Sequence, residues 1–187
     1  NVVADMGRLF GEAIAKKMDQ DLLALFSGFS VGVGGASTAM SPALVANAVA
    51  RLRANSVPGD ALACVLNPYV AYDLKSALTS QGSVAFTGGA YGDVANEAMR
   101  MGYVGNLFGM QVFESANVPL ITSGSAGDYS GAIFHRDALG FGLMRDIQIE
   151  TQRRARAIGT DVVCSAMYGS GVVYEQYGVF ASFDSTI

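Results

Sequence analysis

The chain has 187 residues, of which 51% are hydrophobic and only 15% are charged, and its net charge is −4. This apolar content excludes a disordered chain, because disordered chains have too little apolar surface to bury. The 23 glycines follow no strict period, so a collagen-like repeat is also excluded. The acidic balance argues against a protein whose main ligand is a nucleic-acid backbone. No apolar run reaches the ~18 residues that a membrane-spanning helix needs, so we expect no membrane partner.

The shortage of charge extends to segments that have the composition of loops. No charged residue occurs in residues 76–92, 115–127 or 162–174. Loops of a monomer are normally solvated by charged side chains, whereas the cores of protein interfaces are depleted of charge. We therefore expect an oligomer whose faces are covered by partners.

The chain opens with a helical pattern. Apolar residues recur at close to the helical period and predict a long helix over Val2–Phe26. Two pairs of opposite charge at a spacing of four residues, Glu12–Lys16 and Lys17–Asp21, are expected on its wet side. The next segment, Val31–Gly35, is rich in glycine and is interpreted as a mobile connector, because it lacks the Lys-Ser/Thr of a phosphate-binding loop.

Helix-start signals and apolar runs organise the middle of the chain. Ser41-Pro42 suits the start of a second helix, and Asn67-Pro68 repeats this pattern before a helix that is expected to reach Ser80. Between them, the apolar run Ala61–Leu66 predicts a buried strand. Beyond them we expect a glycine-rich loop at 82–92, a short helix at 93–101, two short strands around Gly109, a polar loop at 122–131 and a strand at 132–134.

The last third of the chain has β-strand patterns. Residues 146–150 alternate between polar and apolar, and Asp161–Tyr168 and Val172–Phe183 are rich in β-branched and aromatic residues. Gly169-Ser170-Gly171 is interpreted as the hairpin turn between these two strands. The whole pattern predicts an α+β fold, in which a mixed α/β lobe is inserted between a long helix and a long terminal β-hairpin.

The sequence offers no arrangement typical of an active site. His135 is the only histidine, and no nucleophile and orienting acid accompany it in a known catalytic motif. Cys64 and Cys164 lie far apart in apolar surroundings, where buried reduced thiols are favoured over a disulfide or a metal site. We therefore expect no catalytic residue, no cofactor and no metal.

Arg153, Arg154 and Arg156 form the only dense basic cluster of the sequence. One interpretation is contact with nucleic acid, which the net negative charge disfavours. The other is a set of ion pairs between subunits with carboxylates such as Asp161, because arginine is enriched in protein interfaces. We favour the second interpretation, and the candidate interface residues are Glu12, Arg153, Arg154 and Arg156.

In four stretches, Gly7–Asp19, Val65–Tyr69, Gly105–Ser115 and 149–179, the chain resembles the major capsid protein of tailed bacteriophages, which has the Hong Kong 97 capsid fold. Gly7–Asp19 resembles the spine helix of that family, and Val65–Tyr69 resembles the Asn-Pro-aromatic corner before a central-lobe helix. Gly105–Ser115 resembles the G-x-L-x-G-x-P-V strand pair, with Gln111 in place of the usual proline. Residues 149–179 resemble the closing strands of the peripheral lobe.

The resemblance implies a peripheral lobe, formed by residues 1–30 and 143–187, and an inserted axial lobe, formed by residues 31–142. It implies a structural protein rather than an enzyme, which self-assembles into hexamers and pentamers of an icosahedral head around double-stranded DNA. Portal or decoration proteins are its further expected partners, DNA is enclosed without sequence-specific binding, and the location is the virion after assembly in the host cytoplasm.

Two alternatives stay open. Encapsulin-type nanocompartments share the same fold and enclose protein cargo instead of a genome. A more distant alternative is a small oligomeric α/β enzyme, with residues 82–92 as a lid over its substrate. Family members also carry an N-terminal arm and an extended loop before the spine helix, and we expect these segments to lie outside this chain.

Overall fold

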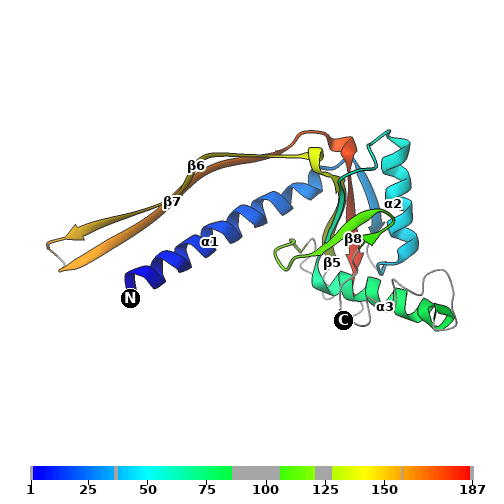
Figure 1. Ribbon diagram of the computed structural model, residues 1–187, viewed down its shortest axis with the longest axis horizontal. Helices are drawn as coiled ribbons and strands as arrows, with labels where there is room; N and C mark the ends of the chain where they lie inside the picture. Colours follow the sequence, from blue (N-terminus) through cyan, green and yellow to red (C-terminus); the bar gives the residue numbers. More distant parts are fainter. Residues whose placement is uncertain (1, 36–37, 86–105, 121–127, 157, 186–187) are drawn as a thin grey trace.

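The computed structural model describes residues 2–35, 38–85, 106–120, 128–156 and 158–185. They form a body around a six-stranded sheet and a long projection in which a helix runs beside a two-stranded hairpin (Figure 1). The elements are α1 (Val2–Ala24), η1 (Leu25–Gly28), β1 (Val31–Gly35), α2 (Pro42–Ala54), β2 (Leu62–Leu66), α3 (Pro68–Ala85), β3 (Asn106–Leu107), β4 (Met110–Glu114), β5 (Asp128–His135), η2 (Arg136–Ala138), β6 (Leu139–Arg154), β7 (Gly159–Val172), η3 (Glu175–Tyr177) and β8 (Gly178–Asp184).

The opening helix is confirmed, and it ends two residues earlier than the apolar period predicts. α1 has 23 residues, which at 1.5 Å per residue is about 35 Å, and the 3-10 turn η1 follows it directly. The predicted Lys17–Asp21 pair is present, with 2.6 Å between Nζ and Oδ1. Glu12 differs from the prediction, because its carboxylate lies 3.1 Å from the guanidinium of Arg8, one turn towards the N-terminus, instead of pairing with Lys16.

The expected connector at Val31–Gly35 is wrong, because this segment is the edge strand β1, paired in parallel with β8. Val33 is buried against the sheet core, so the strand has an apolar side despite its glycines. Gly34 has a φ of +93°, and a side chain there would collide with the backbone oxygen of Ser182 and the ring of Phe183. Glycine is therefore needed where the backbone of β1 closes on β8.

The predicted elements of the middle of the chain are confirmed. α2 begins at Pro42 after an extended Ser41, and β2 occupies five of the six residues in the predicted run. α3 begins at Pro68, where the Asn67 side-chain oxygen accepts a 3.1 Å hydrogen bond from the backbone N–H of Tyr69. α3 continues to Ala85, so it takes in the first residues of the expected glycine-rich loop.

The strands β3 and β4 flank Gly109, as predicted, and β5 contains the predicted strand at 132–134. The expected polar loop is wrong at residues 128–131, which belong to β5. The rest of the glycine-rich loop, the expected helix at 93–101 and residues 122–127 of the polar loop lie outside the described residues.

The predicted C-terminal hairpin is wrong in its turn and in its second strand. β6 is the partner of β7, and the chain reverses between Arg154 and Gly159. The glycines that were read as a turn lie inside β7, where Gly169 pairs with Gly142 and Gly171 pairs with Gly140. Each of these glycines has a glycine partner across the ladder, and the strand continues through them although glycine weakens the interior of a strand.

The six-stranded sheet has the order β1-β8-β5-β2-β4-β3. β8 comes from the end of the chain and lies between β1 and β5, parallel to the first and antiparallel to the second. The segment that follows the hairpin therefore returns into the body, close to the strand that follows α1 (Figure 1).

The sheet buries two separate cores, because the side chains of each strand alternate between its faces. On β8, Val179 and Phe183 pack into the core beneath α2 and α3, whereas Phe180 borders the core at the end of α1. In this second core the ring of Phe26 is 1% exposed, and its centroid lies 5.3 Å from that of Phe134. The body end of α1 is therefore fixed to the sheet, which sets the direction in which the helix leaves.

Candidate subunit-interaction surface

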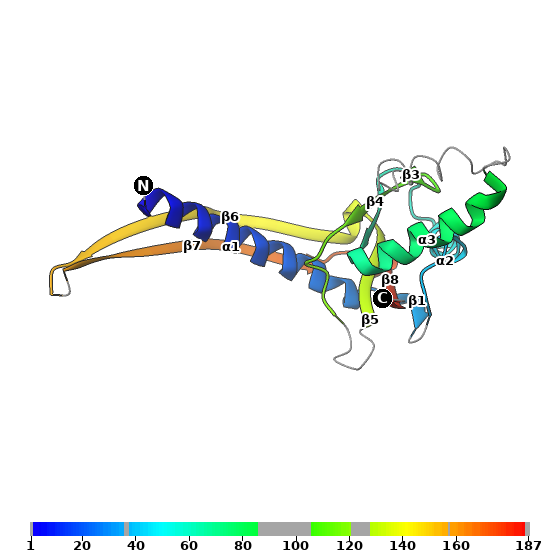
Figure 2. The same cartoon turned by 90° about the horizontal axis from the view of Figure 1, so that it is seen from below.

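The projection, called the arm from here on, consists of α1 and the β6–β7 hairpin. Both views show the helix running beside the hairpin, and α1 contacts both strands (Figures 1 and 2). The hairpin reaches beyond the N-terminal end of the helix (Figure 1). A two-stranded hairpin is marginally stable alone, so one face needs the helix and the remaining surface is free for a partner.

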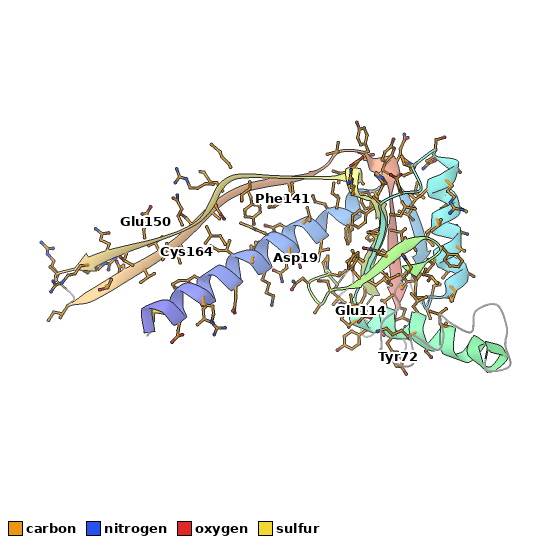
Figure 3. The ribbon with its side chains drawn as sticks, in the orientation of Figure 1. Asp19, Tyr72, Glu114, Phe141, Glu150 and Cys164 are labelled. Carbon is orange, nitrogen blue, oxygen red and sulfur yellow. The ribbon has the colours of Figure 1, made fainter. Side chains whose placement is uncertain are left out.

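The seam between helix and hairpin is formed by close packing and one polar contact. A Cβ at Gly7 would lie 3.3 Å from Cδ1 of Ile149, so the helix approaches β6 closely at this residue. Cys164, which pairs with Ile149, lies on the side of the hairpin that faces α1 (Figure 3). Nearer to the body, the hydroxyl of Tyr168 donates a 2.6 Å hydrogen bond to Oδ2 of Asp21. Through these contacts, one face of the hairpin packs against the helix.

The rest of the arm exposes large apolar side chains. Met144 is 87% exposed and Ile158 is 93% exposed, which is unusual for side chains of this size. Ile158 also has a φ of +49°, an uncommon backbone conformation for a β-branched residue. The other exposed large apolar residues of the arm are Met6, Leu9, Phe10, Phe141, Leu143, Ile149, Val163 and Met167. Such a concentration of apolar surface on one projection is typical of a protein-interaction site.

The predicted arginine cluster lies at the distal end of this arm. Arg154 Nε lies 2.5 Å from Oδ2 of Asp161 on the facing strand, and both side chains are well exposed. Arg153 and Arg156 form no ion pair within the described residues. Glu12 lies on α1 in the same arm, yet its salt bridge is with Arg8 and none joins it to the hairpin arginines in the described chain. One chain therefore does not bring the four predicted residues together.

The body carries a second exposed aromatic group, which the sequence analysis did not identify. Tyr69 and Tyr72 are exposed on the first turns of α3, and Phe113 is exposed on β4. The Lys75–Glu114 ion pair joins the same two elements, and Figure 3 shows Tyr72 and Glu114 at this end of the body. The Asn-Pro-Tyr sequence at the start of α3 could have indicated these tyrosines, because it places Tyr69 on the first turn of a helix.

His135 has a structural role that fits its interpretation as a polar residue at a strand end. It is buried at the end of β5, and its Nδ1 accepts a 3.3 Å hydrogen bond from the backbone N–H of Asp137. The ring meets Tyr177 edge-on, with 6.1 Å between centroids. The histidine therefore caps η2 and supports the junction between body and arm.

The two cysteines are free, as predicted, although only one of them is buried. Cys64 lies in the sheet core, where burial raises the pKa of its thiol to about 12. Cys164 is half-buried on the hairpin, so the expectation of a buried thiol is wrong there. The apolar neighbours of Cys164 in the sequence belong to a two-stranded arm and not to a sheet core.

Other kinds of site find little support in the part of the chain that the structure describes. There, no three His, Cys, Asp or Glu side chains lie close enough together to hold a metal ion. None of the described helices combines the length and apolarity of a membrane span. Among the described residues, a surface hollow of about 540 Å³ is lined by Ala46, Val49, Ala50, Arg53 and Phe108, and arginine is the only titratable side chain of these five.

The comparisons with known proteins point to one family. Residues 1–182 match the family described as phage capsid protein. No curated protein matches the chain. Among solved structures, that of Mycobacterium phage Che8 is 21% identical with a TM-score of 0.74, covering 91% of this chain and 59% of that chain. The capsid of cyanophage P-SCSP1u is 20% identical with a TM-score of 0.70, covering 97% of this chain and 65% of that one.

A third similar structure is the holo-SrpI encapsulin complex from Synechococcus elongatus, at 12% identity and a TM-score of 0.64, covering 96% of this chain and 65% of that one. The chain thus spans less than two thirds of each of these three proteins. At identities this low, the structural similarity shows the fold alone, which is the Hong Kong 97 capsid fold. The family match extends over nearly the whole sequence. The chain belongs to the phage capsid protein family.

Proposed function

We propose that this chain is the shell-forming part of a major capsid protein. Copies associate into hexamers and pentamers of an icosahedral head that encloses double-stranded DNA without sequence-specific binding. The protein acts as a structural component of the virion and not as an enzyme, and it assembles in the host cytoplasm. Portal and decoration proteins are its further partners. The observation that carries this proposal is the family match over residues 1–182.

The lobes of the proposed subunit follow the path of the chain. Residues 1–30 and 143–187 form a peripheral lobe, and residues 31–142 form an axial lobe. β8 anchors the peripheral lobe, because it lies between β1 and β5 in the sheet of the body. At the body end of α1, the core around Phe26 packs against the same sheet. The arm is therefore attached to the body both where α1 ends and where the hairpin continues into β8.

The arm is the proposed main contact between copies. It exposes apolar side chains such as Met144 and Ile158, and burying them against a neighbour removes apolar surface from water. Arg153, Arg154 and Arg156 supply interface ion pairs at the distal end, and Glu12 supplies a carboxylate nearer to the body. Closed symmetry then multiplies modest contacts into a stable shell.

The net charge of −4 fits a container for DNA. A strongly basic inner wall would bind phosphates through counterion release and hold the genome in place. An acidic protein avoids this, which favours packing and release of the genome. Strong, steeply salt-dependent DNA affinity of the assembled protein is the result that would contradict this part of the proposal.

The test is electron microscopy of the full-length protein, combined with digestion and staining of particle contents. Closed shells that protect double-stranded DNA from nuclease are the expected result. A monodisperse single-chain species under all conditions would refute shell formation and restore the enzyme alternative.

A double variant tests the distal arginines separately from the rest of the proposed interface. Arg153→Ala with Arg156→Ala is expected to leave the thermal unfolding temperature unchanged, because both side chains are exposed, and to reduce the yield of closed shells. Arg136→Ala is the control, since it removes one exposed positive charge outside the arm. Normal assembly of the double variant would remove these arginines from the interface.

One observation favours the encapsulin alternative. The fold of the holo-SrpI encapsulin complex is similar to that of this chain, and the match covers 96% of this chain. The microscopy experiment separates the two functions by the contents of the particles. Shells that contain protein cargo and no nuclease-resistant nucleic acid would identify a nanocompartment.

A further inference from the structure

The two strands of the arm differ in their number of residues over one short stretch. Leu143 pairs with Tyr168 and Arg145 pairs with Met167, so β6 advances two residues while β7 advances one. A second irregularity follows, because the next pair joins Gln148 to Ser165. β6 therefore holds two residues more than β7 over this short stretch. Two bulges within six residues of one strand concentrate an irregularity at one place in an otherwise regular ladder.

The side chains identify where the extra residues stand. Met144 has no partner in the register and is among the most exposed side chains of the arm. Asp146 and Ile147 also lack a partner in the register, where β7 has only Ala166, and Oδ1 of Asp146 accepts a 2.7 Å hydrogen bond from the backbone N–H of Ile147. That bond satisfies a backbone donor within the bulge, so the irregularity is locally stabilised. We call residues 144–147 the double bulge.

The hairpin changes direction between Phe141 and Glu150, two residues of β6 that Figure 3 labels, and the double bulge lies between them in the sequence. A β-bulge bends its strand and increases the local twist. Figure 1 shows the hairpin leaving the body in one direction and turning part-way along, at the level of the β6 and β7 labels. The excess of residues in β6 therefore accounts for the bend.

Contacts with α1 hold the hairpin on both sides of this bend. On the body side, Tyr168, which is the partner of Leu143, bonds to Asp21. On the distal side, Ile149 packs at Gly7. Because the number of extra residues is even, Leu143 and Ile149 both pair with β7 residues on the helix-facing side. Two bulges thus turn the arm while preserving its apolar face towards the helix, whereas a one-residue slip would exchange the faces.

We propose that the double bulge fixes the direction of the distal arm relative to the body. Resting on the proposed function, we also propose that this direction sets the angle at which neighbouring copies meet, and hence the curvature of the shell. The first statement concerns one chain and the second concerns the assembly, so each has its own measurement.

The first measurement is the distance between the body and the distal arm. Nitroxide labels are attached at Arg53→Cys on α2 and Thr160→Cys near the tip, in a Cys164→Ser background, with buried Cys64 left in place. The test variant lacks Met144 and Asp146, which gives both strands equal length and keeps the downstream pairing. Pulsed electron resonance is expected to show a shift of several ångströms in the distance distribution.

The matched control is Met144→Ala with Asp146→Ala, which removes the side chains but keeps the number of residues. It is expected to retain the original distance distribution. An unshifted distribution in the test variant, with the β6–β7 amides still protected from exchange, would overturn the first statement. If the double deletion does not fold, two alanines inserted next to Ala166 in β7 equalise the strands instead and keep the helix-facing side, and an unshifted distribution in that variant would again overturn the statement.

The second measurement is the particle diameter of the full-length protein that carries the same deletion. Shells of changed diameter, or open sheets, are the expected result, and the alanine control should form shells of the original size. A shifted label distance with an unchanged diameter would overturn the link to curvature. If the unaltered full-length protein forms no shells, the proposed function fails, while the label distances still decide whether the double bulge directs the arm.

Discussion

Tyr168 and Asp21 are separated by 147 positions in the sequence, and a hydrogen bond of 2.6 Å joins them across the seam between β7 and α1. The other oxygen of the same carboxylate, Oδ1, lies 2.6 Å from the ammonium of Lys17. Both carboxylate oxygens are thus used, one along the helix and one towards the hairpin. The ring of Tyr168 also stacks on Phe141, with 6.0 Å between centroids.

Tyr168→Phe is expected to loosen the helix from the hairpin without unfolding the body. The variant keeps the ring and its stacking on Phe141, and it removes only the donor to Asp21. Hydrogen exchange should become faster for amides along α1 and β7 and stay unchanged for amides of the sheet. Asp21→Asn alone and in combination completes a double-mutant cycle, in which strictly additive effects would contradict a direct coupling between the two side chains.

The same contact predicts a loss of stability at both ends of the pH range. The hydrogen bond from Lys17, and then the one from Tyr168, hold the pKa of Asp21 below its ordinary value of 3.8. This contribution is present above pH 3.8 and is lost as the pH falls through the lowered pKa. The hydrogen bond to Asp21 raises the pKa of Tyr168 above 10.0. That contribution is present below pH 10.0 and is lost as the pH rises through the raised pKa.

The protection factors of the α1 amides, which compare each exchange rate with the intrinsic rate at the same pH, should therefore be constant between these limits and fall outside them. Tyr168→Phe should remove the tyrosine contribution on the alkaline side, leaving that of Lys17, whose pKa is also raised by the hydrogen bond to Asp21. An unchanged profile in Tyr168→Phe would show that the hydroxyl does not contribute to docking.

Phe26→Ala is expected to destabilise the protein by about 3–5 kcal/mol, the range for truncating a fully buried phenylalanine. The side chain is 1% exposed and packs near Phe29 and Phe134 in the core at the root of the arm. Leu9→Ala is the control on α1, the helix that leads directly into η1 and Phe26, because Leu9 is exposed and its truncation should change stability by less than about 0.5 kcal/mol. Denaturant unfolding of both variants checks the difference, and similar losses would contradict the assignment of the core.

The sequence predicts the extent of α1 well, but it does not predict which parts of its apolar face are buried within the chain. The apolar period extends through Met6 and Phe10, which are exposed, as well as through Phe26, which is buried. Periodicity reports which side chains share a face of the helix, and it does not distinguish a face covered by the same chain from one available to a neighbour. The arginine cluster was found from its composition, whereas its place at the tip of the arm depends on where the hairpin turns.

The strands β1 and β7 show why glycine-rich segments were misread. Each contains several glycines, which disfavour a strand on local propensity alone. β1 is held by its pairing with β8, almost 150 residues away, and the glycines of β7 are matched by glycines of β6. These long-range pairings have no counterpart in a local window of sequence, so the predicted turn falls at residues 169–171, whereas the chain reverses between Arg154 and Gly159.

Gly131→Ala is expected to be destabilising by about 1–3 kcal/mol, as is usual when a well-packed core is overfilled. A Cβ at this residue would lie 2.8 Å from Cδ2 of Leu66 and 2.9 Å from the backbone oxygen of Val65, so β2 and β5 would have to move apart. Gly142→Ala is the matched control in a β-strand, since nothing lies within 4 Å of its Cβ position. Equal thermal stability of the two variants would contradict this close approach of β2 and β5.

The two thiols are expected to differ in reactivity, because only one of them is buried. Burial raises the pKa of Cys64 to about 12, so the thiolate that reacts with alkylating agents is scarce near pH 8. Cys164 is half-buried on the hairpin and is accessible. Brief treatment with iodoacetamide at pH 8, followed by mass spectrometry, should find modification at Cys164 and almost none at Cys64. Both should react in guanidinium chloride, and rapid native-state labelling of Cys64 would contradict its place in the sheet core.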